Sequence, residues 1–161
     1  MYTSPALLDV HARAHRSLCA LMSLCETLPS DAFTRELPGF GYPSVRLQLH
    51  HLIGAEAYWV GVIRGDFRAE EDDALYPTVA ALERYRADVA AATAAHLQAT
   101  TDLELNTARE MRTWGDRART LVPARILMRV ITHIYQHQGQ VLAMCRILGS
   151  PSPGGTDFPL D

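Results

Sequence analysis

The stretch THIYQHQGQVLAMCRILG, residues 132–149, combines apolar residues at helical spacing with two histidines, His133 and His137. Positions i and i+4 of an α-helix lie one turn apart on the same face, so both imidazoles can approach one ion. Gly149 ends the pattern and Pro151 follows, which is a typical C-terminal helix signal. The stretch therefore predicts the end of a long helix that carries two ligands of a metal site.

A second stretch is the obvious source of a third ligand. SVRLQLHHLIGAEAYW, residues 44–59, contains the adjacent histidines His50 and His51. At 100° per residue, His51 falls with Gln48 and Tyr58 on the apolar flank of this helix, whereas His50 falls on a face that we interpret as solvated. We therefore expect three inward histidines on two helices, which is a catalytic rather than a structural pattern because positions stay open.

The rest of the chain predicts a four-helix bundle. Residues 100–114 are polar and irregular, with room for a short extended piece, and no strong strand alternation is seen. The connections around the second and third helices are longer than an up-and-down bundle needs, so we expect one or more to cross an end of the bundle. The fold class is all-α, with expected helices at 4–28, 44–64 with Ser44 as N-cap, 77–99, and 117–148, the last with its regular part starting nearer Val122.

Composition limits the classes of protein. The 161 residues suit one domain, 1–161, and a net charge of −3 argues against nucleic acid as a partner. No apolar run reaches the length of a membrane span and no signal peptide is seen, so we expect no membrane partner and a cytoplasmic location. The three cysteines lack CxxC spacing and are interpreted as reduced thiols.

Other residues near the expected site have alternative interpretations. Arg129 and Gln140 share the edge of the apolar face with His133 and His137, while Tyr135 falls on the opposite, solvated face. Arg129 could hold a substrate carboxylate or form a surface salt bridge. Gln140, like Gln48, could orient water or an imidazole. Tyr58 could donate a proton from the cavity wall or belong to the core.

Three further residues have an open role. Glu56 lies at the centre of the core stripe of its helix, and a buried carboxylate needs a partner. It could pair with an arginine from another helix or fix the tautomer of a ligand imidazole. His11 and His15, also spaced i and i+4, are rival ligands or ordinary lining residues.

The two histidine stretches resemble signatures of the DinB/YfiT-like family, namely Ser44-Val45-Arg46, His51-Leu52, Gly54-Ala55-Glu56 and Trp59, and later Thr132-His133, His137, Gly139-Gln140, Leu148-Gly149 and Asp157-Phe158. The resemblance covers essentially the whole chain. It implies a bundle running up-down-down-up, with one divalent metal ion (Zn, Ni, Mn or Fe) on His51, His133 and His137. Arg129, Thr132 and Gln138 depart from the family pattern without removing a ligand.

The resemblance also implies a range of activities. Relatives include metal-dependent hydrolases, S-transferases that use low-molecular-weight thiols, and stress-induced proteins, and they often dimerise. We therefore expect a metal-dependent enzyme acting on a small molecule, most simply a thiol-dependent S-transferase. The alternatives are a hydrolase using metal-bound water and a non-enzymatic stress-related metal-binding protein. The sequence HIYQH lacks the glutamate of HExxH, so zincin-type peptide hydrolysis is not expected.

Overall fold

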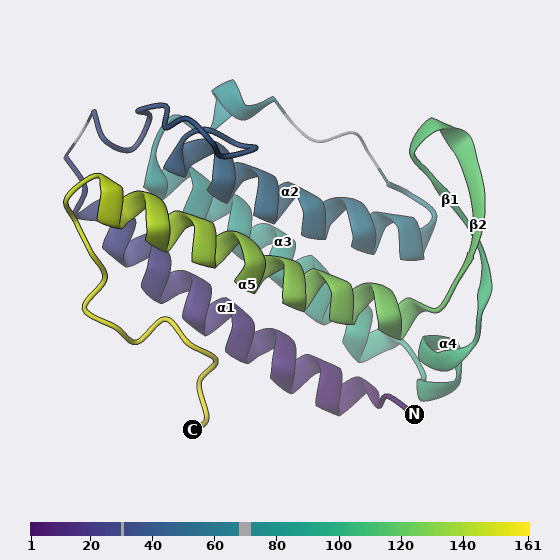
Figure 1. The fold of residues 1–161 in the computed structure, drawn as a ribbon. Coiled ribbons are helices and arrows are strands. Elements are labelled where there is room, and N and C mark those ends of the chain that lie inside the picture. The colour runs from purple at the N-terminus through teal and green to yellow at the C-terminus, as the bar shows by residue number, and fades with distance from the viewer. Residues whose placement is uncertain (30, 68–71) are drawn as a thin grey trace.

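Four long helices make up most of the computed structural model, which describes residues 1–29, 31–67 and 72–161 (Figure 1). The expected all-α bundle is thereby confirmed, with one small addition described below. Between the long helices lie short pieces. The elements are α1 Ser4–Glu26, α2 Val45–Arg64, η1 Asp73–Leu75, α3 Val79–Ala99, α4 Asp102–Asn106, β1 Arg109–Thr113, η2 Trp114–Asp116, β2 Arg117–Leu121 and α5 Pro123–Ile147.

The ends of α2 follow from local chemistry. Ser44 is the N-cap, because its hydroxyl oxygen accepts a hydrogen bond from the Leu47 amide at 3.2 Å. Gly65 ends the helix in the left-handed conformation with φ 77°, which glycine adopts without steric cost. The adjacent histidines His50 and His51 thus lie on a helix whose two ends are both defined by local interactions.

Contacts between helix ends fix the directions of the helices. The Ser4 amide at the start of α1 donates to Asp102 at 2.8 Å, directly after the end of α3. Arg109, in β1, donates to the Ile63 carbonyl at the end of α2 at 2.7 Å. Hence α1 and α5 begin at the end of the bundle that carries the hairpin, and α2 and α3 finish there (Figure 1).

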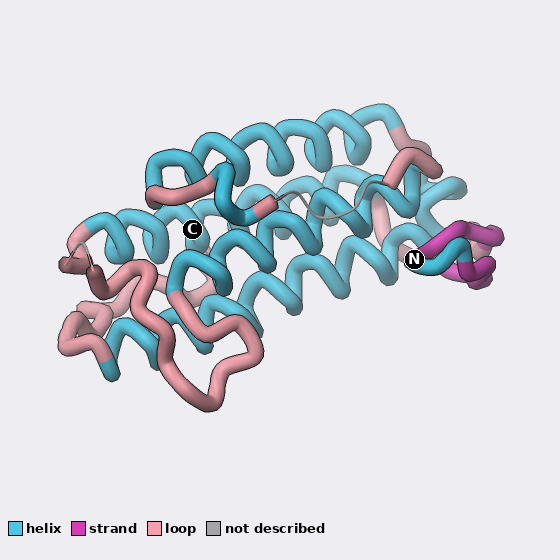
Figure 2. Tube along the Cα trace, turned by 90° about the horizontal axis from the view of Figure 1, so that it is seen from above, coloured by secondary structure: helices cyan, strands magenta, loops and turns pink. Residues whose placement is uncertain are grey.

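Residues 109–121 form a β-hairpin, β1–β2. β1 is the short extended piece expected within 100–114, where α4 also lies, whereas β2 occupies what was expected to be the first turns of the last helix. Gly115 and Asp116 have φ of 67° and 55°, and this left-handed pair reverses the chain. Met111 and Thr113 are buried toward the bundle. The regular helix starts at Pro123, a residue that suits the first helical position. Figure 2 shows the strands (magenta) at one end of the helices.

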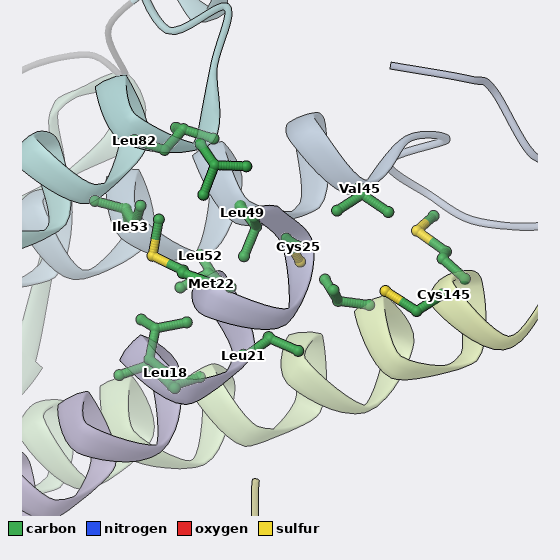
Figure 3. Packing of buried hydrophobic residues seen from close by; sticks show 14 of the residues in the cluster. Leu18, Leu21, Met22, Cys25, Val45, Leu49, Leu52, Ile53, Leu82 and Cys145 are labelled. Atoms are coloured by element: carbon green, nitrogen blue, oxygen red, sulfur yellow. The ribbon is translucent and has the colours of Figure 1, made fainter. Parts of the chain in front are cut away.

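The hydrophobic core extends along the whole bundle in two clusters. The larger joins α1, α2, α3 and α5 and includes Cys25 and Cys145, both free thiols (Figure 3). The smaller lies at the hairpin end around Tyr58, Leu97 and Met111. Among the described helices, none has the length and apolar character needed to cross a bilayer.

Two expectations about exposure are wrong. His50 is only 4% exposed, because the rings of Tyr76 and Tyr85 pack on it at centroid distances of 5.4 and 6.0 Å. Tyr135 is half-buried, with the ring of Phe158 from the C-terminal segment 6.3 Å away. His50 is covered by Tyr76 after η1 and by Tyr85 of α3, and Tyr135 by the C-terminal segment, so in both cases residues distant in the chain cover a helix face that periodicity alone assigns to solvent.

Candidate metal centre

Helices α2 and α5 bring three histidines together at mid-length. One ring nitrogen from each of His51, His133 and His137 lies within 4.8 Å of the others, a grouping that could hold a metal ion. The ring centroids are 4.3 to 5.2 Å apart. His137 is buried, whereas His51 and His133 are half-buried, so the cluster has a protected side and an accessible one.

Gln48 determines which nitrogen of His137 faces the cluster. Its amide nitrogen donates to the Tyr42 carbonyl at 2.9 Å and to the Gln140 side-chain oxygen at 2.8 Å, so its own oxygen points the other way. His137 Nδ1–H donates to that oxygen at 2.6 Å. The lone pair of His137 therefore lies on Nε2, 3.0 Å from Nε2 of His133. This is the tautomer that a metal ligand needs.

Tyr42 forms one wall of the cluster. Its ring stacks on His51 at a centroid distance of 3.9 Å and 18° between planes, and it meets the edge of His137 at 6.1 Å. Tyr42 lies in the loop before α2, where helical periodicity gives no information. No sequence signal except its closeness to the Ser44 cap could have identified it.

The three imidazoles are neutral near pH 7. Burial, followed by the neighbouring histidines, lowers the pKa of His51 to about 4. Burial, then His137 and Arg129, lowers the pKa of His133 to about 4 as well, and burial lowers that of His137. Neutral imidazoles are the form that binds metal, so the protein environment favours the ligand state.

The other expected site residues are not all brought to the histidines. Gln140 contacts the cluster through Gln48. Arg129 is exposed, one turn before His133, with its guanidinium carbon 5.2 Å from the Trp59 ring centroid. The Tyr58 hydroxyl accepts a hydrogen bond from the Trp114 amide at 2.8 Å, so this side chain connects α2 to the turn of the hairpin.

Glu56 lies in a second polar cluster, between α1, α2 and α3. It is 2% exposed and accepts hydrogen bonds from His11 at 2.8 Å, His15 at 2.9 Å and the Thr93 hydroxyl at 2.7 Å. Burial raises its pKa, but the bonds from His11 and His15 outweigh this and leave it well below the ordinary value. Of the two roles considered for Glu56, the described residues provide neither a direct arginine partner nor a contact with an expected ligand, because His11 and His15 occupy both carboxylate oxygens.

His11, His15 and Glu56 also form a grouping that could hold a metal ion. Their proton arrangement makes them the weaker candidate. Arg86 faces Nδ1 of His15 at 3.1 Å, and because a guanidinium only donates, this nitrogen must be the acceptor. The proton of a neutral His15 is then on Nε2, where a metal would need the lone pair. The α2–α5 cluster has the opposite and suitable arrangement.

The fold and the site define a class of protein, a helical bundle with a candidate three-histidine metal centre between two helices. The chain belongs to the DinB family, whose family model matches residues 1–161. Its fold is similar to that of a DinB-like protein from Bacillus cereus ATCC 10987, with a TM-score of 0.74, 22% sequence identity, and coverage of 96% of this chain and 99% of the other. The comparison with curated proteins gave no match.

Proposed function

We propose that the protein is an enzyme that binds one divalent metal ion on His51, His133 and His137. The observation that carries this proposal is the fixed tautomer of His137, whose Nε2 lone pair faces the other two rings while Gln48 holds Nδ1–H. Three protein ligands leave positions for a substrate, whereas structural zinc sites are usually closed by four. When bound, the ion supplies Lewis acidity and lowers the pKa of a coordinated thiol or water.

The side chains around the site have defined roles in this proposal. Gln48 orients His137, and Gln140 orients Gln48. Tyr42 covers one face of His51 and excludes water from it. Arg129, exposed beside His133, lies over the Trp59 ring and offers its N–H groups to an anionic part of the substrate.

For the reaction, we propose transfer of a low-molecular-weight thiol to an electrophile. The support is the family resemblance together with the cationic Arg129 at the accessible side, which suits a thiol that carries a carboxylate. Arg129 is neither a ligand nor a base, because a guanidinium stays protonated and only donates, so its contribution is binding and not proton transfer. Arg129→Ala is therefore expected to raise KM for an anionic thiol more than it lowers kcat.

Metal content tests the site. We expect His51→Ala, His133→Ala and His137→Ala each to lower the metal content of untagged protein below one ion per chain, measured by elemental analysis. His96→Ala, a half-buried histidine of α3, is the matched control and should retain wild-type content. His11→Ala distinguishes the two clusters. Loss of metal in this variant, with retention in the other three, would show that the ion binds to His11, His15 and Glu56 instead.

Turnover tests the reaction. Metal-loaded protein is expected to accelerate conjugation of cysteine-containing thiols to an electrophile such as a haloalkane or epoxide, and removal of the metal should abolish the acceleration. If no thiol binds to the cobalt-loaded form by absorption spectroscopy, the transferase proposal fails. Hydrolysis of an ester or amide panel would then identify a hydrolase, and no turnover in either assay would leave a metal-binding protein.

A further inference from the structure

A cavity lies where the hairpin meets α2, and none of the three candidate metal ligands lines it. Its volume is about 660 Å³, within the range of small-molecule pockets. Both tryptophans of the chain, Trp59 and Trp114, line it. The remaining lining residues are Tyr58, Thr113, Arg117, Ala118 and Arg119.

The hairpin register directs two arginines toward the bundle. Met111 pairs with Arg119 and Thr113 pairs with Arg117. Directly opposed residues of an antiparallel pair lie on the same face of the sheet. Met111 and Thr113 are buried against the bundle, so Arg117 and Arg119 project from the bundle-facing side of the hairpin, beside the cavity.

These two arginines differ from the others of the hairpin. Arg109 donates to the Ile63 carbonyl, and Arg112 pairs with Glu110 and Asp116. No carboxylate pairs with Arg117 or Arg119 among the residues that the structure describes. Arg117 and Arg119 are exposed, have no carboxylate partner among the described residues and share the hairpin face that borders the cavity, so they provide a local binding site for an anion in a chain of net charge −3.

Aromatic rings form the apolar part of the cavity. Tyr58 is fixed by its hydrogen bond from the Trp114 amide, and its ring lies 4.5 Å from Trp114 and 5.1 Å from Trp59 between centroids. Trp114 nevertheless remains 58% exposed. A large aromatic side chain that is held in place but uncovered offers a stacking surface for a flat ligand.

We propose that this cavity binds a small molecule with a flat apolar body and a carboxylate, the body on Trp59 and Trp114 and the carboxylate on Arg117 and Arg119. Trp59 also carries the guanidinium of Arg129, which lies one turn before His133 on α5, so one residue connects this cavity to the helix that bears two of the candidate ligands. The use of this cavity as the subsite for the anionic end of the substrate rests on the proposed function. The binding of a flat carboxylate to the cavity does not depend on it.

Tryptophan fluorescence provides a selective measurement, because the only two tryptophans of the chain line the cavity. The probes are naphthalene-2-carboxylate and its neutral analogue naphthalene-2-carboxamide, added to metal-free protein. We expect the carboxylate to quench with a Kd about tenfold lower than the amide, as charge-assisted hydrogen bonds to arginine imply. Arg117→Gln/Arg119→Gln should remove this difference.

The matched control is Arg35→Gln/Arg146→Gln, which removes the same charge from two exposed positions outside the cavity and should retain the preference. Circular dichroism on both double variants checks that the fold is intact. Equal Kd values for carboxylate and amide in the wild type, or an equal loss of the carboxylate preference in both double variants, would overturn the proposal. The two arginines would then serve only to prevent pairing of another strand with the exposed edge of the hairpin. His133→Ala should bind the carboxylate as the wild type does, so failure of the metal proposal is distinguishable from failure of this one.

Discussion

At the residue scale, Gln48 connects the loop before α2, the candidate ligand His137 and the neighbouring Gln140. Gln48 is fully buried. Its amide nitrogen donates to the Tyr42 carbonyl and the Gln140 side-chain oxygen, and its amide oxygen accepts from His137. Such outer contacts orient ligand imidazoles and typically change metal affinity by about 10- to 100-fold when lost. Gln48 is thus the most informative position at which to perturb the site without removing a ligand.

Gln48→Met should weaken zinc binding by about 10- to 100-fold, because His137 loses the acceptor that fixes its tautomer. Competition with a chromophoric chelator measures the Kd. Gln136→Met, the same change at an exposed position of α5 one residue from His137, is the control and should leave the Kd unchanged. A wild-type Kd in Gln48→Met would contradict the role of this amide.

Protonation of His51 and His133 should destabilise the metal-free protein. Their pKa values are about 4 in the folded state, against about 6.5 in the unfolded chain, so the unfolded state binds more protons between these values. The free energy of unfolding should therefore be highest above pH 6.5 and fall as the pH decreases toward 4. Urea unfolding at pH 7, 6 and 5 measures this slope. His51→Asn/His133→Asn should reduce it, and an unchanged slope would show that other groups cause it.

At the element scale, two glycines within helices have opposite surroundings. A Cβ at Gly61 of α2 would lie 2.7 Å from the Phe67 Cα, because the chain after α2 turns back onto the helix. Among the described residues, a Cβ at Gly139 of α5 would meet no atom within 4 Å apart from the neighbouring backbone of its own helix. The first glycine permits a close backbone approach, whereas the second only adds conformational freedom to the unfolded chain.

Gly61→Ala should lower the free energy of unfolding by about 1 to 3 kcal/mol, the usual range for overpacking. The same substitution at Gly139 should raise it by about 0.5 to 1 kcal/mol, the helix preference of alanine over glycine. Chemical denaturation of both variants measures the two effects with identical chemistry. Equal effects of the same sign would refute the assigned surroundings.

At the scale of the whole molecule, Glu56 links three helices through buried hydrogen bonds. His11 and His15 come from α1 and Thr93 from α3, while Glu56 itself belongs to α2. Removing one partner from a buried charged network usually costs more than the network itself contributes. The cluster therefore fixes how α1, α2 and α3 pack, and the candidate metal centre lies on a different face of α2.

Glu56→Gln should lower the free energy of unfolding by about 3 kcal/mol, because the amide N–H₂ would face a histidine donor at a position that is only 2% exposed. Urea denaturation at pH 7 measures the change. Glu26→Gln, at the exposed end of α1, removes the same charge and should change stability by less than about 0.5 kcal/mol. Metal content should stay at the wild-type value in Glu56→Gln, and its loss there would indicate that this second cluster holds the ion.

Helical periodicity was sufficient for the long helices, the Ser44 cap and the closeness of His133 to His137, because these depend on interactions within one or two turns. The register of α2, and with it the inward direction of His51, could also be obtained from the apolar pattern. Of the hairpin, only a short extended piece was expected, where β1 lies. The pairing with β2 could not be predicted, since the burial pattern involves only Met111 and Thr113 and the turn depends on the left-handed Gly115 and Asp116.

By itself, the sequence determined the four long helices, the closeness of His133 to His137 and the inward side of His51, because these follow from spacing along single helices, while the family resemblance implied that all three bind one ion. Only the tertiary structure decided which nitrogens carry protons. Gln48 and Arg86 lie far in sequence from His137 and His15, and they give the two histidine clusters opposite tautomers. It also decided that His50 is covered by Tyr76 and Tyr85, and that Arg117 and Arg119 face the bundle. Such contacts join residues distant in the chain, so no local pattern encodes them.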